Sequence, residues 1–280
     1  MSVSIFVPAH ITGFFSIKDN NDPLKKGSTG AGFLLDKGVK TSIKPTRNDK
    51  TSIKINGKVD NYNQNIILKV LKLLDIDYAV KISQEIQVPI GSGFGTSAAS
   101  ALSTAMGLSE MFDLNNDFIK SGQIAHLAEV ALGSGLGDVS AQLGKGIVVR
   151  KKPGAPGICE IESMKTDLYV GCRSFGEIST ESVINDPHYR KSICDAGEDM
   201  QKRFLKSRTS RNFLESSIEF SKRTGLIDDN LMSAIEELNR RDGIIGSSMA
   251  MLGNTVFSFS QNRESLDGLD IYKINNEGII

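Results

Sequence analysis

The chain has 280 residues, and its 33 Lys and Arg residues balance 33 Asp and Glu residues, so the formal net charge is zero. No net field would draw such a chain to nucleic acid or to an anionic membrane, and we therefore expect a small-molecule partner. The three cysteines lack CxxC spacing, which argues against a disulfide framework or a structural zinc site and favours the cytoplasm.

The first residues, MSVSIFVPAHITG, predict a strand rather than a signal peptide, because they lack a basic region and Pro8 and His10 interrupt their apolar character. Two longer stretches, 86–109 and 243–262, carry no charge. Both are rich in glycine and hydroxyl residues, so neither predicts a membrane-spanning helix.

Hydrophobic periodicity predicts the elements of the first half of the chain. Alternating apolar residues indicate strands at 39–43, 53–55 and 80–88. Apolar residues at helical spacing indicate a helix over 61–74. Further helices are expected at about 97–112 and 117–132, and a buried strand at 147–149 follows them.

The segment KKPGAPG at 151–157 is the clearest break in the pattern. We place a domain boundary there, which gives an N-terminal domain over 1–155 and a C-terminal domain over 156–280. The C-terminal part predicts a strand near 168–172 and mostly helices between 188 and 240. A helix over 247–252 and a strand over 255–259 are expected to close it.

The most distinctive segment is PIGSGFGTSAASA, in which a strand end leads through a glycine-dense turn into a helix of small residues. Glycines let the backbone approach a ligand closely, and a helix N-terminus favours an anion. For an isolated GxGxG, a tight structural turn is an equally good explanation. The segment fits neither a P-loop nor a dinucleotide fingerprint, so we predict a different phosphate site, formed by Gly91, Ser92, Gly93, Phe94, Gly95, Thr96 and Ser97.

This segment resembles the second motif of the GHMP kinases, Pro-x-Gly-x-Gly-Leu-Gly-Ser-Ser-Ala-Ala, with Phe94 in the leucine position. PAHITG near the N-terminus is similar to the first motif of that superfamily, and GIIGSSMAMLGNTVF resembles a divergent third motif. Within the superfamily, the chain resembles the archaeal pantoate kinases of coenzyme A biosynthesis. The segments that carry this resemblance are FVPAHITGFF, GSTGAGF, AHLAEVALGSGLGDVSAQLGKG, GEIST and SMAMLGNTVF.

The resemblance implies an α+β fold of two domains. The N-terminal domain would bind ATP on a mixed sheet with helices, the C-terminal domain would be ferredoxin-like, and the substrate would lie between them. It also implies ATP-dependent phosphorylation of the primary hydroxyl of pantoate to 4-phosphopantoate, with Mg²⁺. A homodimer is a further expectation.

Two acids follow the phosphate segment. Glu129 lies three residues after His126 and therefore on the same helix face, and Asp138 follows a second glycine loop. Taken singly, a solvated helix residue and a helix N-cap would explain them. The resemblance instead implies that Ser97 and Glu129 hold Mg²⁺ and that Asp138 takes the hydroxyl proton, because phosphoryl transfer needs both functions.

A substrate with a carboxylate and two hydroxyls calls for a cation and neutral donors. We expect Arg150 to be the cation, although a surface arginine at a strand end is an alternative. Ser28, His126 and Thr180 lie in segments that resemble the substrate region, and their alternatives are a turn residue, a buried histidine and a cap. His10 stands where several GHMP kinases carry lysine, and it either binds substrate or packs.

Two other functions stay open. One is a GHMP kinase for another alcohol, such as homoserine, shikimate or a mevalonate-type acid. The other is a catalytically inactive ATP-binding module, which only the missing first-motif lysine supports. Retention of Ser97, Glu129 and Asp138 argues against the inactive module.

Overall fold

The computed structural model describes residues 2–46, 50–59, 64–114, 117–176, 183 and 186–280. Its described strands form two sheets. The larger sheet has the order β3-β4-β2-β5-β6, with β1 paired to β2 outside that path. Its strands are β1 (Val3–Lys18), β2 (Gly27–Pro45), β3 (Ser52–Ile55), β4 (Val80–Ile86), β5 (Ile147–Lys152) and β6 (Glu160–Met164).

Strand β2 is long enough to pair with three other strands. Its first half pairs with β5, its second half with β4, and β1 runs antiparallel along both halves. Strand β1 is buried at most positions instead of alternating, because helices of both parts of the chain contact it. The expected first strand is therefore confirmed, and it extends to Lys18.

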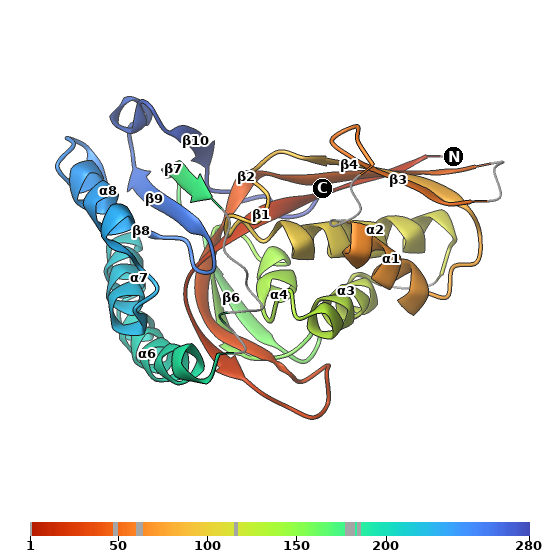
Figure 1. Ribbon diagram of the computed structural model, residues 1–280, viewed down its shortest axis with the longest axis horizontal. Coiled ribbons are helices and arrows are strands. Elements are labelled where there is room, and N and C mark those ends of the chain that lie inside the picture. The colour runs from red at the N-terminus through yellow and green to blue at the C-terminus, as the bar shows by residue number, and fades with distance from the viewer. Residues whose placement is uncertain (1, 47–49, 60–63, 115–116, 177–182, 184–185) are drawn as a thin grey trace.

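Four helices lie together beneath the larger sheet in Figure 1. They are α1 (Gln64–Leu73), α2 (Thr96–Met111), α3 (Phe118–Leu132) and α4 (Asp138–Gln142). Small residues let α2 lie close to β2, and a Cβ added at Gly107 would come within 2.9 Å of Ile43 Cδ1. The helices expected at 97–112 and 117–132 are thus confirmed.

The second sheet is antiparallel, in the order β10-β7-β9-β8. It contains β7 (Tyr169–Gly176), β8 (Ile244–Met249), β9 (Asn254–Ser260) and β10 (Asp270–Lys273), and η1 (Arg263–Leu266) precedes β10. Three helices stack beside it in Figure 1. They are α6 (Pro187–Lys206), α7 (Ser210–Thr224) and α8 (Asp229–Asn239).

The helix expected over 247–252 is wrong. Residues of that segment belong to β8, which pairs with β9 from Ile244 to Met249. A short run of small and apolar residues fits either period, and here the neighbouring strand supplies its hydrogen bonds. The expected strand over 255–259 is confirmed as β9.

The domain boundary near residue 155 stays a prediction. Residues 153–159 connect β5 to β6, and these two strands pair with each other, so the larger sheet continues to Met164. The second sheet begins with β7 at Tyr169. The chain end returns to the larger sheet, where Ile280 and Phe6 exchange backbone hydrogen bonds.

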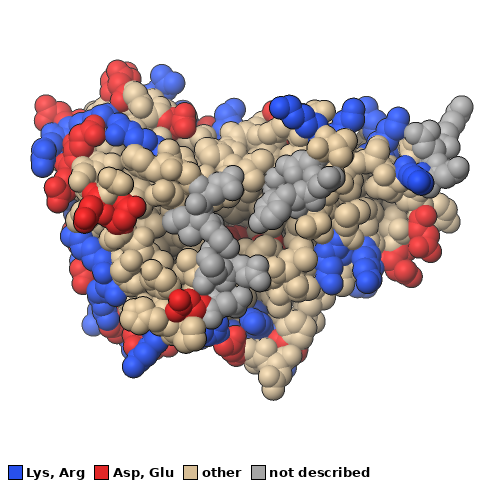
Figure 2. Space-filling view, viewed as in Figure 1, with Lys and Arg blue, Asp and Glu red and all other residues tan. Residues whose placement is uncertain are grey.

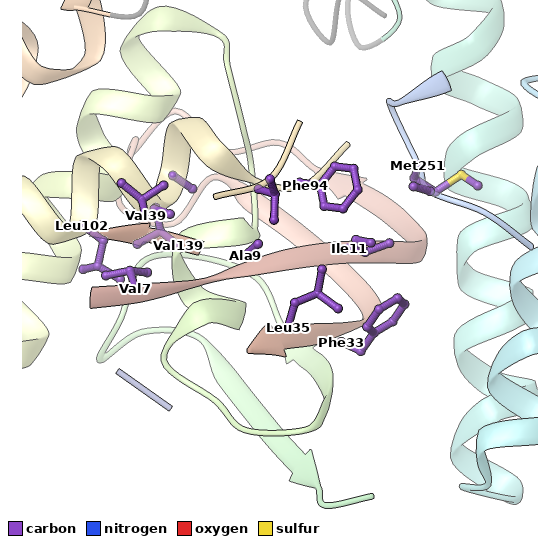
Figure 3. Packing of buried hydrophobic residues seen from close by; sticks show 14 of the residues in the cluster. Val7, Ala9, Ile11, Phe33, Leu35, Val39, Phe94, Leu102, Val139 and Met251 are labelled. Carbon is purple, nitrogen blue, oxygen red and sulfur yellow. The ribbon is translucent and has the colours of Figure 1, made fainter. Parts of the chain in front are cut away.

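An aromatic cluster joins the two parts. The ring of Phe33 on β2 lies 5.0 Å, centroid to centroid, from both Phe257 and Phe259 on β9. Figure 3 shows Phe33 near Ile11 of β1, with Met251 of the β8–β9 turn beyond them. Such rings contribute much of the energy of a core, so the two sheets are held at a fixed place relative to each other.

Charged side chains of both signs are interspersed around the face shown in Figure 2. No single sign dominates that face. Among the helices that the structure describes, none combines the length and the apolar character that a bilayer crossing requires.

Helix α3 is tied to the connection between β1 and β2 through His126. The ring Nε2 lies 3.1 Å from the carbonyl oxygen of Pro23, and the ring is almost fully buried. Burial lowers the pKa of His126, while hydrogen bonds with the backbone at Pro23 and Lys26 act in the opposite direction. The folded protein therefore favours a neutral ring at this position.

This lowered pKa predicts a loss of stability in acid. In the unfolded chain His126 takes up a proton near its ordinary pKa of 6.5, whereas in the folded protein it does so only at lower pH. The stability that neutral His126 contributes above pH 6.5 is therefore lost as the pH falls below that value. His126→Gln should flatten this dependence, by up to about 1.4 kcal/mol per pH unit in the unfolding free energy. Urea unfolding between pH 5 and 8 measures it. His188→Gln on the exposed face of α6 is the matched control, and parallel curves for wild type and His126→Gln would contradict the assignment.

Candidate active site

The glycine-dense turn has the backbone that a phosphate site requires. Gly91, Gly93 and Gly95 have φ values of 71°, 87° and 61°, in the region that favours glycine. Gly95 is also the N-cap of α2, and it offers no side chain to the first N–H groups of the helix. No backbone acceptor for the N–H groups of residues 96–98 is seen among the described residues, so these donors suit an anion.

Ser92 and Phe94 of this turn contact other parts of the protein. Ser92 Oγ donates to the carbonyl oxygen of Gly176 at 3.3 Å, and the Ser92 carbonyl accepts from Thr255 at 2.9 Å. Phe94 is buried, with its ring edge-on to Tyr272. The backbone, rather than these side chains, is what the turn can offer to a phosphate.

Glu129 on α3 reaches the start of α2. Its Oε1 accepts from Ser97 Oγ at 2.5 Å and from Ser134 Oγ at 2.7 Å, and its side chain is 3% exposed. Burial raises the pKa of Glu129 to about 7, although the two hydroxyls act against this rise. No salt bridge to Glu129 is seen among the described residues. A buried carboxylate of this kind suits a cation.

Asp138, the first residue of α4, is paired with His10 of β1. Asp138 Oδ1 lies 2.6 Å from His10 Nδ1. Burial acts to raise the pKa of Asp138, but the hydrogen bond from His10, the charge of Arg150 and a hydrogen bond from Thr12 outweigh it, and the net shift is downward. The side chain is 28% exposed. Asp138 is thus an ionised carboxylate with access to a ligand.

Arg150 is a buried cation without full compensation. Its side chain lies on β5, opposite Gly30 of β2, and is 2% exposed. Its Nε and Nη1 have no hydrogen-bond partner within the part of the chain that the structure describes. Because an unpaired buried charge is strongly unfavourable, this guanidinium is suited to receive an anion.

Glycines let these groups converge. A Cβ added at Gly137 would lie 2.3 Å from Ser28 Oγ and 2.8 Å from Arg150 Nε. A Cβ at Gly135 would lie 2.1 Å from Glu129 Oε2 and 3.7 Å from Asp138 Oδ2. The loop that contains Gly135 and Gly137 fits between these side chains because its glycines carry none of their own.

Most of the predicted site residues come together around these loops. The turn over residues 91–97, the phosphate turn, is joined to Glu129 through Ser97 and to the backbone of His10, which in turn binds Asp138. Ser28 and Arg150 lie beside Gly137, the residue that precedes Asp138. His126 instead binds the Pro23 carbonyl, so a direct contact with substrate stays a prediction. Thr180 lies outside the described residues.

Three residues of the site were not predicted from the sequence. Ser134 donates to Glu129, Thr12 to Asp138, and Gln142 Nε2 to the carbonyl oxygen of Gly95 at 3.0 Å. Gln142 lies four residues after Asp138, and this spacing places both on one face of α4. The spacing was a usable signal, whereas Ser134 and Thr12 are ordinary members of serine- and threonine-rich segments.

The sequence of this chain is similar to that of known proteins. Residues 65–146 match the GHMP kinases N terminal domain. Over 96% of this chain and 97% of the relative, the sequence is 38% identical to a pantoate kinase of Methanocaldococcus jannaschii. It is 36% identical to a pantoate kinase of Thermococcus kodakarensis, over 95% of this chain and 90% of that protein.

Two solved structures have folds similar to that of this chain. A phosphotransferase related to the coenzyme A biosynthesis pathway superposes with a TM-score of 0.88 and 32% identity, over 100% of this chain and 98% of that one. A homoserine kinase from Cytophaga hutchinsonii has a TM-score of 0.66 at 18% identity, over 100% and 96% of the two chains, which shows a shared fold. The two-part α+β fold expected from the sequence is confirmed. The chain belongs to the pantoate kinase family, within the GHMP kinases.

Proposed function

We propose that this protein transfers the γ-phosphoryl group of ATP to the primary hydroxyl of pantoate, which gives 4-phosphopantoate for coenzyme A biosynthesis. The GHMP kinases use ATP as phosphate donor. In the step, a bond forms between the hydroxyl oxygen and the γ-phosphorus, the bond to the bridging oxygen breaks, and ADP leaves. The resemblance to pantoate kinases over nearly the whole chain supports this assignment.

The observation that carries the proposal is the buried guanidinium of Arg150. Pantoate brings one carboxylate, and two donor nitrogens of Arg150 lack a partner among the described residues. Ser28 Oγ lies beside the same side chain, across Gly137, and offers a neutral donor for a substrate hydroxyl. Arginine is the usual partner of a carboxylate because its planar donors match two oxygens.

Asp138 is the acceptor for the hydroxyl proton in this scheme. Its pKa is lowered, so it is ionised at neutral pH and able to take a proton. The N-terminus of α2 would hold the phosphates through backbone N–H groups. Phosphoryl transfer relies mainly on such positioning and on stabilisation of charge.

The residues also fit Mg²⁺. Ser97 and Glu129 offer oxygen donors at the phosphate turn. Burial raises the pKa of Glu129, whose carboxylate forms no salt bridge with any described residue. Among the described residues, no group of three or more His, Cys, Asp or Glu side chains is placed to hold a metal ion. This is typical of Mg²⁺, which takes few protein ligands and completes its shell with phosphates and water. Bound there, the ion would offset the charge that develops on the transferring phosphoryl group.

Other acceptors fit less well. Homoserine carries an ammonium group, which would need an acidic partner, and the acids of the site already have the roles given above. Shikimate and mevalonate share a carboxylate and hydroxyls with pantoate, so the similarity to pantoate kinases is what favours pantoate over them. Cytoplasmic location and a homodimer stay predictions from the sequence.

Removing either proposed ligand should weaken metal activation. Ser97→Ala and Glu129→Gln should each raise the Mg²⁺ concentration for half-maximal activity by on the order of tenfold, because each removes an oxygen donor. Titration of ADP release with Mg²⁺ at saturating ATP measures the effect. Ser100→Ala, one turn further along α2, is the matched control. Unchanged titrations for both ligand variants would refute the metal assignment.

Arg150→Met should remove recognition of the substrate carboxylate. We expect a loss of about 2–4 kcal/mol in transition-state binding, on the order of tens to hundreds of fold in kcat/KM for pantoate. The preference for pantoate over pantothenate, whose carboxylate is replaced by an amide, should shrink as well. Coupled assays with both substrates measure these ratios.

The control for this variant is Lys151→Met. Lys151 follows Arg150 on β5, but its ammonium pairs with Glu160 and Glu162 at the surface. It should leave kcat/KM for pantoate near wild type, and the KM for ATP should be similar in both variants. A full preference for pantoate in Arg150→Met would place the cation elsewhere.

A further inference from the structure

His10 contacts both halves of the reaction site. Its ring Nδ1 lies 2.6 Å from Asp138 Oδ1, and its backbone N–H donates to the Phe94 carbonyl of the phosphate turn at 3.0 Å. The residue lies next to an irregularity in the pairing of β1 with β2. One residue therefore links the carboxylate to the turn that would hold the phosphates.

The second ring nitrogen of His10, Nε2, is buried against strand β2. It has no hydrogen-bond partner within the residues that the structure describes. A Cβ added at Gly32 would lie 2.2 Å from it, so the backbone of β2 covers that edge of the ring. A proton on Nε2 would be a buried donor without an acceptor, which costs about 1–3 kcal/mol or more when charged.

The hydrogen bond to Asp138 determines where the single proton lies. A carboxylate accepts hydrogen bonds, so the facing Nδ1 has to carry the proton and Nε2 has to be bare. Burial lowers the pKa of His10, Asp138 acts to raise it, and the nearby charge of Arg150 lowers it further. Geometry and charge agree on a neutral ring.

We propose that His10 is a neutral positioning residue, whose Nδ1–H donates to Asp138 and holds its carboxylate in one orientation beside the phosphate turn. This inference rests on the proposed role of Asp138 as proton acceptor. Of the two alternatives for His10, substrate binding and packing, it favours packing, because the ring is fully buried and one of its edges lies against Gly32.

A neutral donor differs from the lysine that several GHMP kinases carry in this motif. A cation at His10 would stabilise ionised Asp138 more strongly and make it a weaker base. Arg150 already places a positive charge near Asp138, and Glu129 adds a negative one. A second buried cation would also need to lose its hydration. The imidazole orients the carboxylate without adding charge.

The tautomer can be measured on the unmodified sequence. The chain has three histidines, so ¹⁵N-histidine spectra can be assigned with His126→Gln and His188→Gln. We expect His10 to stay neutral between pH 6 and 8, with a proton on Nδ1 and none on Nε2. A proton on Nε2, or an imidazolium at pH 7, would overturn the proposal. The measurement does not depend on whether Asp138 acts in catalysis.

A matched pair of amides tests the positioning role. The amide nitrogen of His10→Asn falls near Nδ1, whereas that of His10→Gln falls near Nε2. We expect His10→Asn to keep kcat within about tenfold and His10→Gln to lose on the order of a hundredfold, both with KM for ATP unchanged. The acid limb of the kcat profile should also move to higher pH in His10→Gln, as Asp138 loses its donor.

Equal losses in the two amides, or none in either, would contradict a positioning role. If either variant fails to fold, as judged by thermal unfolding, the tautomer measurement decides. An Asp138 variant with normal kcat would remove the proposed proton acceptor while leaving the tautomer result intact, so the two failures can be told apart.

Discussion

The geometry of the site depends on the attachment of α4 to the phosphate turn. Gln142 donates to the Gly95 carbonyl, and Asp138 binds His10, whose own N–H donates to Phe94. Both ends of α4 are thereby fixed to the turn that would carry the phosphates. Because phosphoryl transfer depends on alignment more than on covalent chemistry, these few hydrogen bonds set the geometry on which the proposed reaction relies.

The site holds charges that the folded protein does not fully compensate. Arg150 and Glu129 are both buried. Two donor nitrogens of Arg150 have no partner among the described residues, and the pKa of Glu129 is raised. Their burial costs stability, which the aromatic core between the two sheets helps to offset. In the proposed function, a substrate carboxylate and a metal ion supply the missing partners, so the same features that weaken the free protein favour binding.

Sequence reasoning succeeded where the signal is local. The glycine turn and the helix after it follow from residues that are adjacent in the chain, and the acids keep a recognisable spacing. It failed for β8, because the run 247–252 fits two periods and its partner β9 decides between them. The partner of His126 is the Pro23 carbonyl, 103 residues away, and no pattern in the sequence indicates that contact. The pairing of His10 with Asp138 spans 128 residues of the chain and is equally invisible to local patterns.

The most direct test of the account is the rate of the chemical step in Asp138→Asn. Rapid-quench single-turnover measurements, with ATP and pantoate saturating, separate this step from binding and product release. We expect a fall of roughly two to four orders of magnitude, with the fold retained and ATP affinity unchanged, because the asparagine amide cannot accept the hydroxyl proton. A rate of phosphoryl transfer near that of the wild type would contradict it.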